Sequence, residues 1–323
     1  MNPVGAIRRA LAMLCALLVL LGLGDVPAGA ASLTAARGIA VLYPEVAEPY
    51  RSVFAKIVEG IEDQAKGRVA SFEIGPNQSP QNIMIELRRQ DIRVVIALGR
   101  NGLRLASGLD RDIGLVAGAM VSVPETQARS ITLFSLAPSP ALMFSRLQSL
   151  MPNARRVFVV YDPAQNGWLI RLAKEAARAR GLELVAYEAA DLKTALRIYR
   201  EILAAADAKK DALWLPQDSN TVDDTLVLPL VLQEAWSRDL TFFSSSVAHV
   251  RRGALFSLYP NNLEMGRNLA HSSLGLLASG TVGASGVLPL TDVLMAVNVR
   301  TADHLGINIS RMQQSFDLVF PEP

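Results

Sequence analysis

Residues 151–163 read MPNARRVFVVYDP, and residues 292–320 read DVLMAVNVRTADHLGINISRMQQSFDLVF. The first stretch predicts a loop and then a buried strand that stops at Tyr161-Asp162-Pro163. The second predicts a strand, a polar stop at Asn298 and a short helix around Thr301–Leu305. Together they open and close a strand–helix series that follows an earlier series in residues 37–123. Two such series predict two linked α/β lobes, with a cleft that could hold a small ligand.

The first series alternates regularly. Its apolar runs predict strands at residues 38–43, 68–74, 91–99 and 113–121, and helices at about 50–61, 80–89 and 101–107. The continuous run DIRVVIALG at 91–99 is typical of a parallel strand that is buried on both faces. Pro138 and Pro140 interrupt the alternation in residues 131–141, so we expect this stretch to cross between the lobes.

The second series repeats the pattern. We expect strands at 155–162, 182–188, 211–217 and 240–246, and helices at 141–150, 166–180, 191–203 and 221–238. Asp191 is a predicted N-cap, and Asp223-Asp224 is interpreted as negative charge in the first turn of a helix. Residues 254–260 predict a return crossing, followed by a helix at 263–279 and a hinge-like loop at 280–286.

This alternation predicts an α/β fold with two Rossmann-like lobes, whose parallel sheets are joined by a multi-strand hinge. Lobe 1 is expected to hold residues 31–137 and about 258–285, and lobe 2 residues 138–257. Residues 286–323 are expected to cross the hinge, and the sequence assigns them to neither lobe.

Residues 1–30 resemble a cleaved secretory signal. Arg8 and Arg9 precede a short apolar run, Leu11–Leu23, and Ala28-Gly29-Ala30 fits a cleavage site. An uncleaved anchor helix is the alternative. The only cysteine, Cys15, lies inside the apolar run, so the mature chain is expected to lack disulfides and a lipid anchor. These features predict an exported, periplasmic protein.

The charge balance gives no sign of a nucleic-acid partner. Cleavage after Ala30 would remove Arg8, Arg9 and Asp25 from 32 basic and 30 acidic residues, which leaves a net charge of +1. Nucleic-acid binding usually requires a basic field. The sequence contains no dinucleotide-binding, P-loop or nucleophile-elbow motif. His249, His271 and His304 lack metal-ligand spacing and are interpreted as surface or packing residues. We therefore predict no catalytic residues, metal or cofactor.

Polar and aromatic residues gather where the predicted strands end. Ligands of open α/β sheets bind outside the carboxyl ends of the strands. Aromatic side chains there could bury an apolar body, and hydroxyl and amide groups could orient it. Asp162 or Asp218 could receive an ammonium group, and Arg100 or the serine run could receive a carboxylate. The predicted ligand-binding residues are Tyr43, Arg100, Asn101, Ser122, Tyr161, Asp162, Trp214, Gln217, Asp218, Ser245 and Tyr259.

The second half resembles a known family. The stretches PNARRVFVVYDP (152–163), ALWLPQDSNTV (212–222), RRGALFSLYPNNLEMGRNLA (251–270) and LPLTDVLMAVNVRTADHLGINI (288–309) carry the resemblance. They are similar to ABC-transporter substrate-binding proteins of the tryptophan/tyrosine-binding type, which have the type I periplasmic binding protein fold. The resemblance implies that Tyr161, Asp162, Asp218 and Ser245 face the cleft. Residues 122–126 are shorter than the corresponding loop of the family and lack its Gly-Ser-Gly pattern.

Three functions follow from these observations. The first is a solute-binding protein of an ABC importer, which captures a small organic ligand, an amino acid or an aromatic acid, by hinge closure and passes it to an inner-membrane permease. The second is a sensor or interaction module of the same fold that signals to a membrane kinase or an assembly partner. The third is a periplasmic enzyme, which the absence of a nucleophile or acid–base constellation disfavours. We expect a monomer.

Overall fold

The computed structural model describes residues 38–75, 77–124, 127, 129–280, 285–309 and 316–321, which belong to one compact unit, Ala36–Pro323. The predicted signal peptide of residues 1–30 and most of the predicted loop at 280–286 lie outside these residues. Among the helices so described, none is long and apolar enough to cross a membrane.

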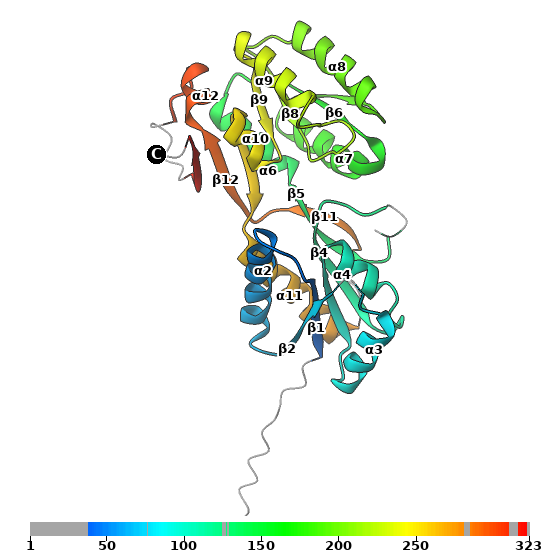
Figure 1. Cartoon of the computed structure of the whole chain (residues 1–323). Helices are drawn as coiled ribbons and strands as arrows, with labels where there is room; N and C mark the ends of the chain where they lie inside the picture. The colour runs from blue at the N-terminus through cyan, green and yellow to red at the C-terminus, as the bar shows by residue number, and fades with distance from the viewer. Residues whose placement is uncertain are drawn as a thin grey trace, which may run out of the picture. The chain divides into compact units, whose positions relative to one another are not determined.

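Six parallel strands form the larger sheet, in the order β11-β5-β4-β3-β1-β2. They are β1 (Ile39–Pro44), β2 (Val69–Ile74), β3 (Val94–Leu98), β4 (Gly114–Met120), β5 (Thr132–Pro138) and β11 (Gly286–Leu290). Successive side chains point to opposite faces, so Val41 packs on one side and Leu42 on the other. Helices α2 (Tyr50–Ala65) and α11 (Asn262–Ser279) cover the first face, and α3 (Pro80–Arg89) and α4 (Gly99–Ala106) cover the second (Figure 1).

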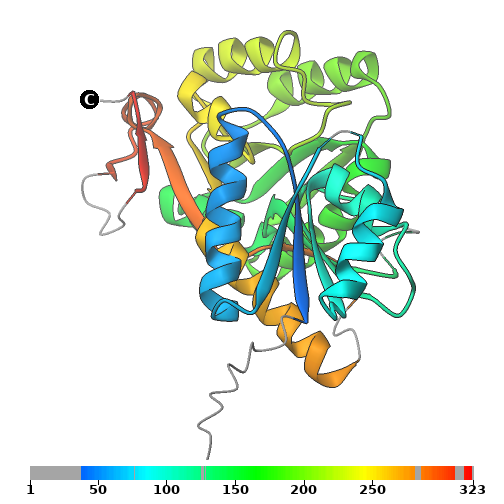
Figure 2. The same cartoon turned by 60° about the horizontal axis from the view of Figure 1, so that its bottom comes forward.

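Two glycines let α2 and α11 approach closely. A Cβ atom added at Gly266 would lie 2.0 Å from the Ile57 carbonyl oxygen, and one at Gly60 would lie 2.0 Å from the Leu263 carbonyl oxygen. Only residues without a side chain fit this contact. Figure 2 shows the two helices side by side. Helix α11, which follows the second strand–helix series, thus returns to cover the first sheet.

Four parallel strands form the second sheet, in the order β7-β6-β8-β9. They are β6 (Arg156–Tyr161), β7 (Glu183–Glu188), β8 (Asp211–Leu215) and β9 (Thr241–Ser244). Helices α6 (Pro140–Leu150) and α7 (Pro163–Ala179) pack on the face that contains Trp214 and Phe243. Helices α8 (Leu192–Ala205) and α9 (Val227–Ser237) pack on the face of Leu213 and Phe242. The predicted N-cap of α8 is confirmed, because Asp191 accepts a hydrogen bond of 2.9 Å from the Thr194 amide.

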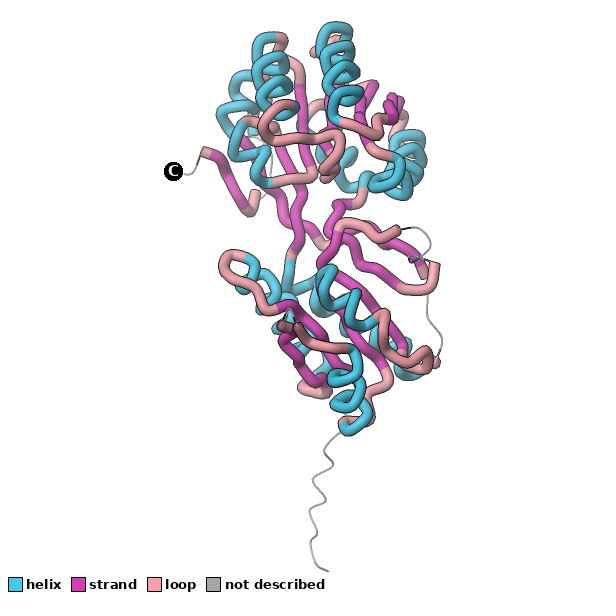
Figure 3. The backbone as a smooth tube through the Cα atoms, turned by 45° about the vertical axis from the view of Figure 1, so that its right-hand side comes forward, coloured by secondary structure: helices cyan, strands magenta, loops and turns pink. Residues whose placement is uncertain are grey.

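A third sheet holds β10 (Phe256–Pro260), β12 (Val293–Asn298) and β13 (Leu318–Phe320). Strand β12 runs antiparallel to β10 and parallel to β13. Three segments connect elements of the two parallel sheets: β5 leads to α6, β10 leads to α11, and β11 leads to β12. Figure 3 shows the strands with helices on both faces of each parallel sheet. The predicted α/β class with parallel sheets and several connecting strands is confirmed.

Residues 131–141 connect elements of the two parallel sheets, as predicted, but they do so through a regular strand, β5, which continues the alternation and pairs with β4 and β11. Pro138 ends this strand and Pro140 begins α6, where the missing N–H is not needed. The interpretation of Asp223-Asp224 was wrong. Helix α9 begins at Val227, so Asp223-Asp224 precedes it. The Asp223 carboxylate instead accepts hydrogen bonds from the Thr225 and Leu226 amides, a local structure that competes with the helix.

Candidate functional site

Three of the predicted strand ends lie next to one another at the carboxyl edge of the four-stranded sheet. Strand β8 pairs with β6 on one side and with β9 on the other. The loop after β8, Pro216–Asn220, therefore lies between Tyr161-Asp162 after β6 and Ser244–Ser246 after β9. We call these three segments the lobe 2 edge. The strand order thus brings these three polar segments together.

Two buried aspartates hold the lobe 2 edge together. Both side chains are only 5% exposed. Asp218 accepts four hydrogen bonds, from the Asp162 amide (2.7 Å), the Asn166 side-chain amide (2.9 Å), and the Asn220 and Thr221 amides (3.0 and 3.1 Å). A carboxylate has about four acceptor sites, so Asp218 has none to spare.

Asp162 is engaged in the same way. It caps α7 by accepting from the Ala164 amide at 2.8 Å, and it accepts from the side-chain amides of Asn220 at 2.6 Å and Gln165 at 3.4 Å. The predicted role of either aspartate as receptor of an ammonium group does not fit these contacts. Their hydrogen bonds instead fix the ends of β6 and β8 against each other.

Gln217 and Trp214 organise the other half of the lobe 2 edge. The Gln217 side-chain amide donates to the Ser245 carbonyl at 3.0 Å, while Gln217 Oε1 is buried and has no partner among the residues that the structure describes. The Trp214 indole N–H donates to Ser245 Oγ at 3.1 Å. Trp214 is fully buried between Phe144 and Phe243, so it positions Ser245 from the core and does not form an exposed aromatic wall. That part of the sequence prediction is corrected, because helices cover both faces of β8 and all five residues of this strand are buried.

Tyr161 is also buried at this edge. Its hydroxyl donates to Glu188 Oε1 at 2.9 Å. Burial, and then the hydrogen bond to the Glu188 carboxylate, raise the pKa of Tyr161 to about 12. The phenol therefore remains protonated at neutral pH and links the ends of the neighbouring strands β6 and β7.

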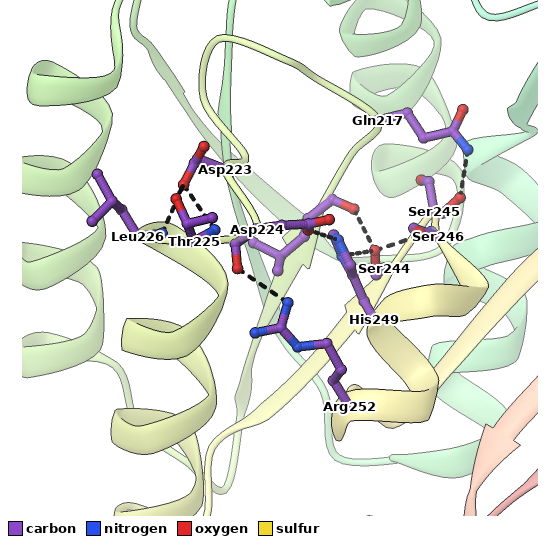
Figure 4. Close-up of polar contacts among 11 residues, drawn as sticks. Gln217, Asp223, Asp224, Thr225, Leu226, Ser244, Ser245, Ser246, His249 and Arg252 are labelled. Atoms are coloured by element: carbon purple, nitrogen blue, oxygen red, sulfur yellow. Dashed lines mark hydrogen bonds and ion pairs between the residues drawn. The ribbon is translucent and has the colours of Figure 1, made fainter.

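A chain of hydrogen bonds joins buried Ser244, buried His249 and exposed Asp224 behind the serine run (Figure 4). His249 Nδ1 lies 2.8 Å from Ser244 Oγ, and His249 Nε2 lies 2.9 Å from Asp224 Oδ1. Burial lowers the pKa of His249, although the hydrogen bond and charge of Asp224 oppose this effect. The carboxylate can only accept from Nε2, so the neutral ring uses Nδ1 to accept from the Ser244 hydroxyl.

This chain has the composition of a catalytic triad but not its accessibility. Ser244 is 0% exposed, and its Oγ also accepts a hydrogen bond of 3.0 Å from the Ser246 amide. A nucleophile must reach the substrate carbonyl, and this hydroxyl faces the protein interior. The chain instead ties the end of β9 to the loop before α9, and Arg252 secures it by donating to the Asp224 carbonyl at 3.0 Å.

The carboxyl edge of the six-stranded sheet carries all the remaining predicted residues except Tyr259. Arg100 and Ser122 line a cavity of about 700 Å³, together with Arg104, Met120, Gln127 and Gln165. Asn101 is exposed on α4 and does not line it. Tyr43 is half-buried against the face that α2 and α11 cover. Tyr259 lies on β10 and packs against the core of the four-stranded sheet. The structure thus brings Arg100 and Ser122 together and leaves Asn101, Tyr43 and Tyr259 apart from them.

Several residues of these clusters were not predicted. Arg104 follows Arg100 by one helical turn, and Asn166 follows Asp162 by one turn, so helical spacing could have indicated both. Asp224 lies in a stretch that was assigned to the start of a helix, which obscured its loop contacts. Asn220 lies in the predicted polar segment after β8 but was not among the predicted ligand-binding residues. The link between Ser244 and His249 joins a strand end to a short helix, α10 (Val247–Arg252), that the sequence pattern did not reveal.

The protein has an α/β fold with two parallel sheets, and this fold is similar to that of type I periplasmic binding proteins. Solved structures share the fold at low sequence identity. A ligand-free, open substrate-binding protein with adhesive properties from Clostridium difficile is 17% identical, with a TM-score of 0.59 and coverage of 87% of this chain and 99% of that one. An ABC domain in complex with L-Trp from Streptococcus pneumonia is 16% identical, with a TM-score of 0.53 and coverage of 87% and 98%. A conserved domain protein from Vibrio cholerae is 19% identical, with a TM-score of 0.50 and coverage of 84% and 96%.

The sequence profile described as "ABC transporter substrate binding protein" matches residues 143–313. The chain belongs to the ABC transporter substrate binding protein family, whose members are binding proteins and not enzymes. A comparison with curated proteins found no match.

Proposed function

We propose that this protein is the periplasmic solute receptor of an ABC importer. In this proposal the signal peptide of residues 1–30 is removed after export. Residues 31–137 with about 258–285 then form one lobe, residues 138–257 form the other, and residues 286–323 cross the hinge. A small organic ligand binds between the lobes and favours the closed form, which docks on the inner-membrane permease. The ligand shifts the equilibrium only by its higher affinity for the closed form.

The observation that carries this proposal is the construction of the lobe 2 edge. Its backbone is fixed by the buried Asp162 and Asp218 carboxylates, so its polar groups are held in place before any ligand arrives. Within this fixed edge Gln217 Oε1 accepts no hydrogen bond from the part of the chain that the structure describes. An unmatched buried acceptor costs about 1–3 kcal/mol. A hydroxyl or ring N–H of a ligand would satisfy it, which supports Gln217 as a ligand contact.

The type of ligand follows from the family and the cavity. The resemblance to the tryptophan/tyrosine-binding type and the L-Trp complex of a distant structural neighbour support a ligand of the size of an aromatic amino acid. The cavity beside Arg100 and Ser122, about 700 Å³, lies within the range of about 300–1,000 Å³ that small-molecule sites have.

A thermal-shift screen followed by small-angle X-ray scattering tests the proposal. The screen covers amino acids, aromatic acids, aliphatic acids and nucleobases. A compound that raises the melting temperature should also reduce the radius of gyration, and Gln217→Ala should weaken its binding at least tenfold. Arg197→Gln, which changes an exposed ion pair with Glu201 on α8, is the control. Binding without any compaction would overturn the hinge-closure mechanism.

A further inference from the structure

The cavity at the edge of the six-stranded sheet is positively charged. Arg100 and Arg104 lie one turn apart on α4, so their side chains share a face of the helix. Both are exposed, and neither guanidinium forms a hydrogen bond or ion pair with any residue that the structure describes. No acidic side chain is among the described residues that line the cavity. Two like charges at this spacing repel each other, and an anion placed between them would remove the repulsion.

The remainder of the cavity is mostly apolar. Leu103, Met120, Val123 and Pro124 contribute hydrocarbon surface, and Ser122 contributes a hydroxyl. Gln165, from the first turn of α7, already accepts from the Ser219 hydroxyl at 3.1 Å. This combination suits a ligand with an anionic head and an apolar body. Arg recognises carboxylates especially well because its planar fork can donate two parallel hydrogen bonds.

No matching receptor for an ammonium group is available at the lobe 2 edge. The carboxylates of Asp162 and Asp218 are buried and accept three and four hydrogen bonds from the protein, respectively. Glu188 is exposed and has acceptor sites beyond the one that the Tyr161 hydroxyl uses, but it follows the outer strand β7 and does not line the cavity. The exposed Glu45, which follows β1, does not line the cavity. An amino acid in this cavity would therefore meet no free carboxylate among the described residues that line it.

We propose, on the basis of the function proposed above, that the solute is an organic acid without an amino group. Its carboxylate binds Arg100 and Arg104, and its body packs on Leu103, Met120 and Val123. This differs from the amino-acid ligand that the family resemblance suggests. The distinction comes from which charged groups of this chain are free and which are already bonded.

Matched compounds test the inference directly. Indole-3-propionate, L-tryptophan and tryptamine share the indole ring. The first carries only the carboxylate, the second carries both the carboxylate and the ammonium group, and the third carries only the ammonium group. The pairs 3-phenylpropionate with L-phenylalanine, and 4-methylpentanoate with L-leucine, extend the comparison to ligands with other apolar groups. Titration calorimetry should show that at least one acid binds, and that it binds at least tenfold more tightly than its amino acid. Inorganic phosphate tests whether any anion suffices, and we expect it to bind more weakly than that acid.

Variants locate the anion. Arg100→Gln and Arg104→Gln should each weaken binding of that acid at least tenfold. Glu45→Gln and Arg197→Gln, the latter from an exposed ion pair on α8, should leave it unchanged. An amino acid that binds more tightly than its acid, compacts the protein and depends on Glu45 would overturn this inference and leave the proposed function intact. Tighter binding of phosphate would also overturn it. If no compound of either series binds, both proposals fail.

Discussion

The carboxyl edges of the two parallel sheets differ in how their polar groups are used. At the edge of the four-stranded sheet, Asp162, Asp218 and His249 are buried and bonded to other protein groups. At the edge of the six-stranded sheet, Arg100 and Arg104 are exposed and have no partner among the described residues. The first arrangement creates a rigid surface, and the second leaves charge available for a ligand. Within one α/β fold, buried polar residues can thus serve structure while exposed ones serve binding.

The largest loss of stability is expected from Asp218→Ala, which removes a buried carboxylate from the edge of the four-stranded sheet. The substitution leaves four donors without their acceptor, three of them buried, including the Asp162 amide and the Asn166 side chain. Loss of a buried, fully bonded carboxylate should lower the free energy of unfolding by about 3–5 kcal/mol. Urea denaturation measures this change. Asp112→Ala, at an exposed position, should change stability by less than about 0.5 kcal/mol. A small effect at Asp218 would mean that this edge is not held by its carboxylate.

A smaller loss is expected from Trp214→Phe. The change removes part of a fully buried ring and the hydrogen bond to Ser245 Oγ, so the free energy of unfolding should fall by about 2 kcal/mol. Ligand affinity should fall less than it does in Gln217→Ala, because Trp214 acts through Ser245. Comparing denaturation with calorimetry separates the two quantities. A larger loss of affinity in Trp214→Phe than in Gln217→Ala would indicate that Trp214 contacts the ligand directly.

The pH dependence of stability tests the buried histidine chain. Because burial lowers the pKa of His249 in the folded state, the unfolded chain binds more protons than the folded protein at mildly acidic pH. The stability that depends on neutral His249 is fully present above its ordinary pKa of about 6.5 and is lost as pH falls through the folded-state pKa. Asp224 opposes the shift and Arg252 reinforces it.

Urea denaturation between about pH 7.5 and about pH 5 should therefore show falling stability, with a shallower slope in His249→Asn. His271→Gln, at an exposed position of α11, should keep the wild-type slope. Equal slopes in wild type and His249→Asn would show that this ring does not control the acid response.

The smallest effect is expected from Arg104→Gln in the absence of ligand. Relief of the like-charge contact with Arg100 should raise the free energy of unfolding by about 0.2–0.5 kcal/mol. The same substitution should weaken binding of an organic acid. Arg197→Gln, which breaks a favourable contact with Glu201 at the same spacing, should slightly lower stability instead. A loss of stability in Arg104→Gln would show that its guanidinium has a stabilising partner after all.

Sequence patterns predicted the local elements well. Helix Pro80–Arg89, the Asp191 cap and the strands at residues 38–43, 68–74 and 182–188 agree with the structure to within about one residue. Apolar periodicity and capping depend on neighbouring residues, which the sequence displays directly. The parallel arrangement followed from the same alternation.

The use of each polar side chain could not be predicted in the same way. Asp218 bonds to the Asp162 amide across 56 residues, and Trp214 bonds to Ser245 across 31. Whether a carboxylate is free or bonded depends on such distant pairings, which no local pattern reports. The start of α9 was also misplaced, because Asp223 and Thr225 look like a helical first turn and instead form local hydrogen bonds.

The most direct test is small-angle X-ray scattering of the purified protein with indole-3-propionate, or with the organic acid that stabilises it most. Our account predicts that the radius of gyration decreases on saturation with the acid. It also predicts that the Arg100→Gln/Arg104→Gln double variant, at the same acid concentration, keeps the dimensions of the free protein. An acid that saturates the wild-type protein without changing its radius of gyration would contradict the account.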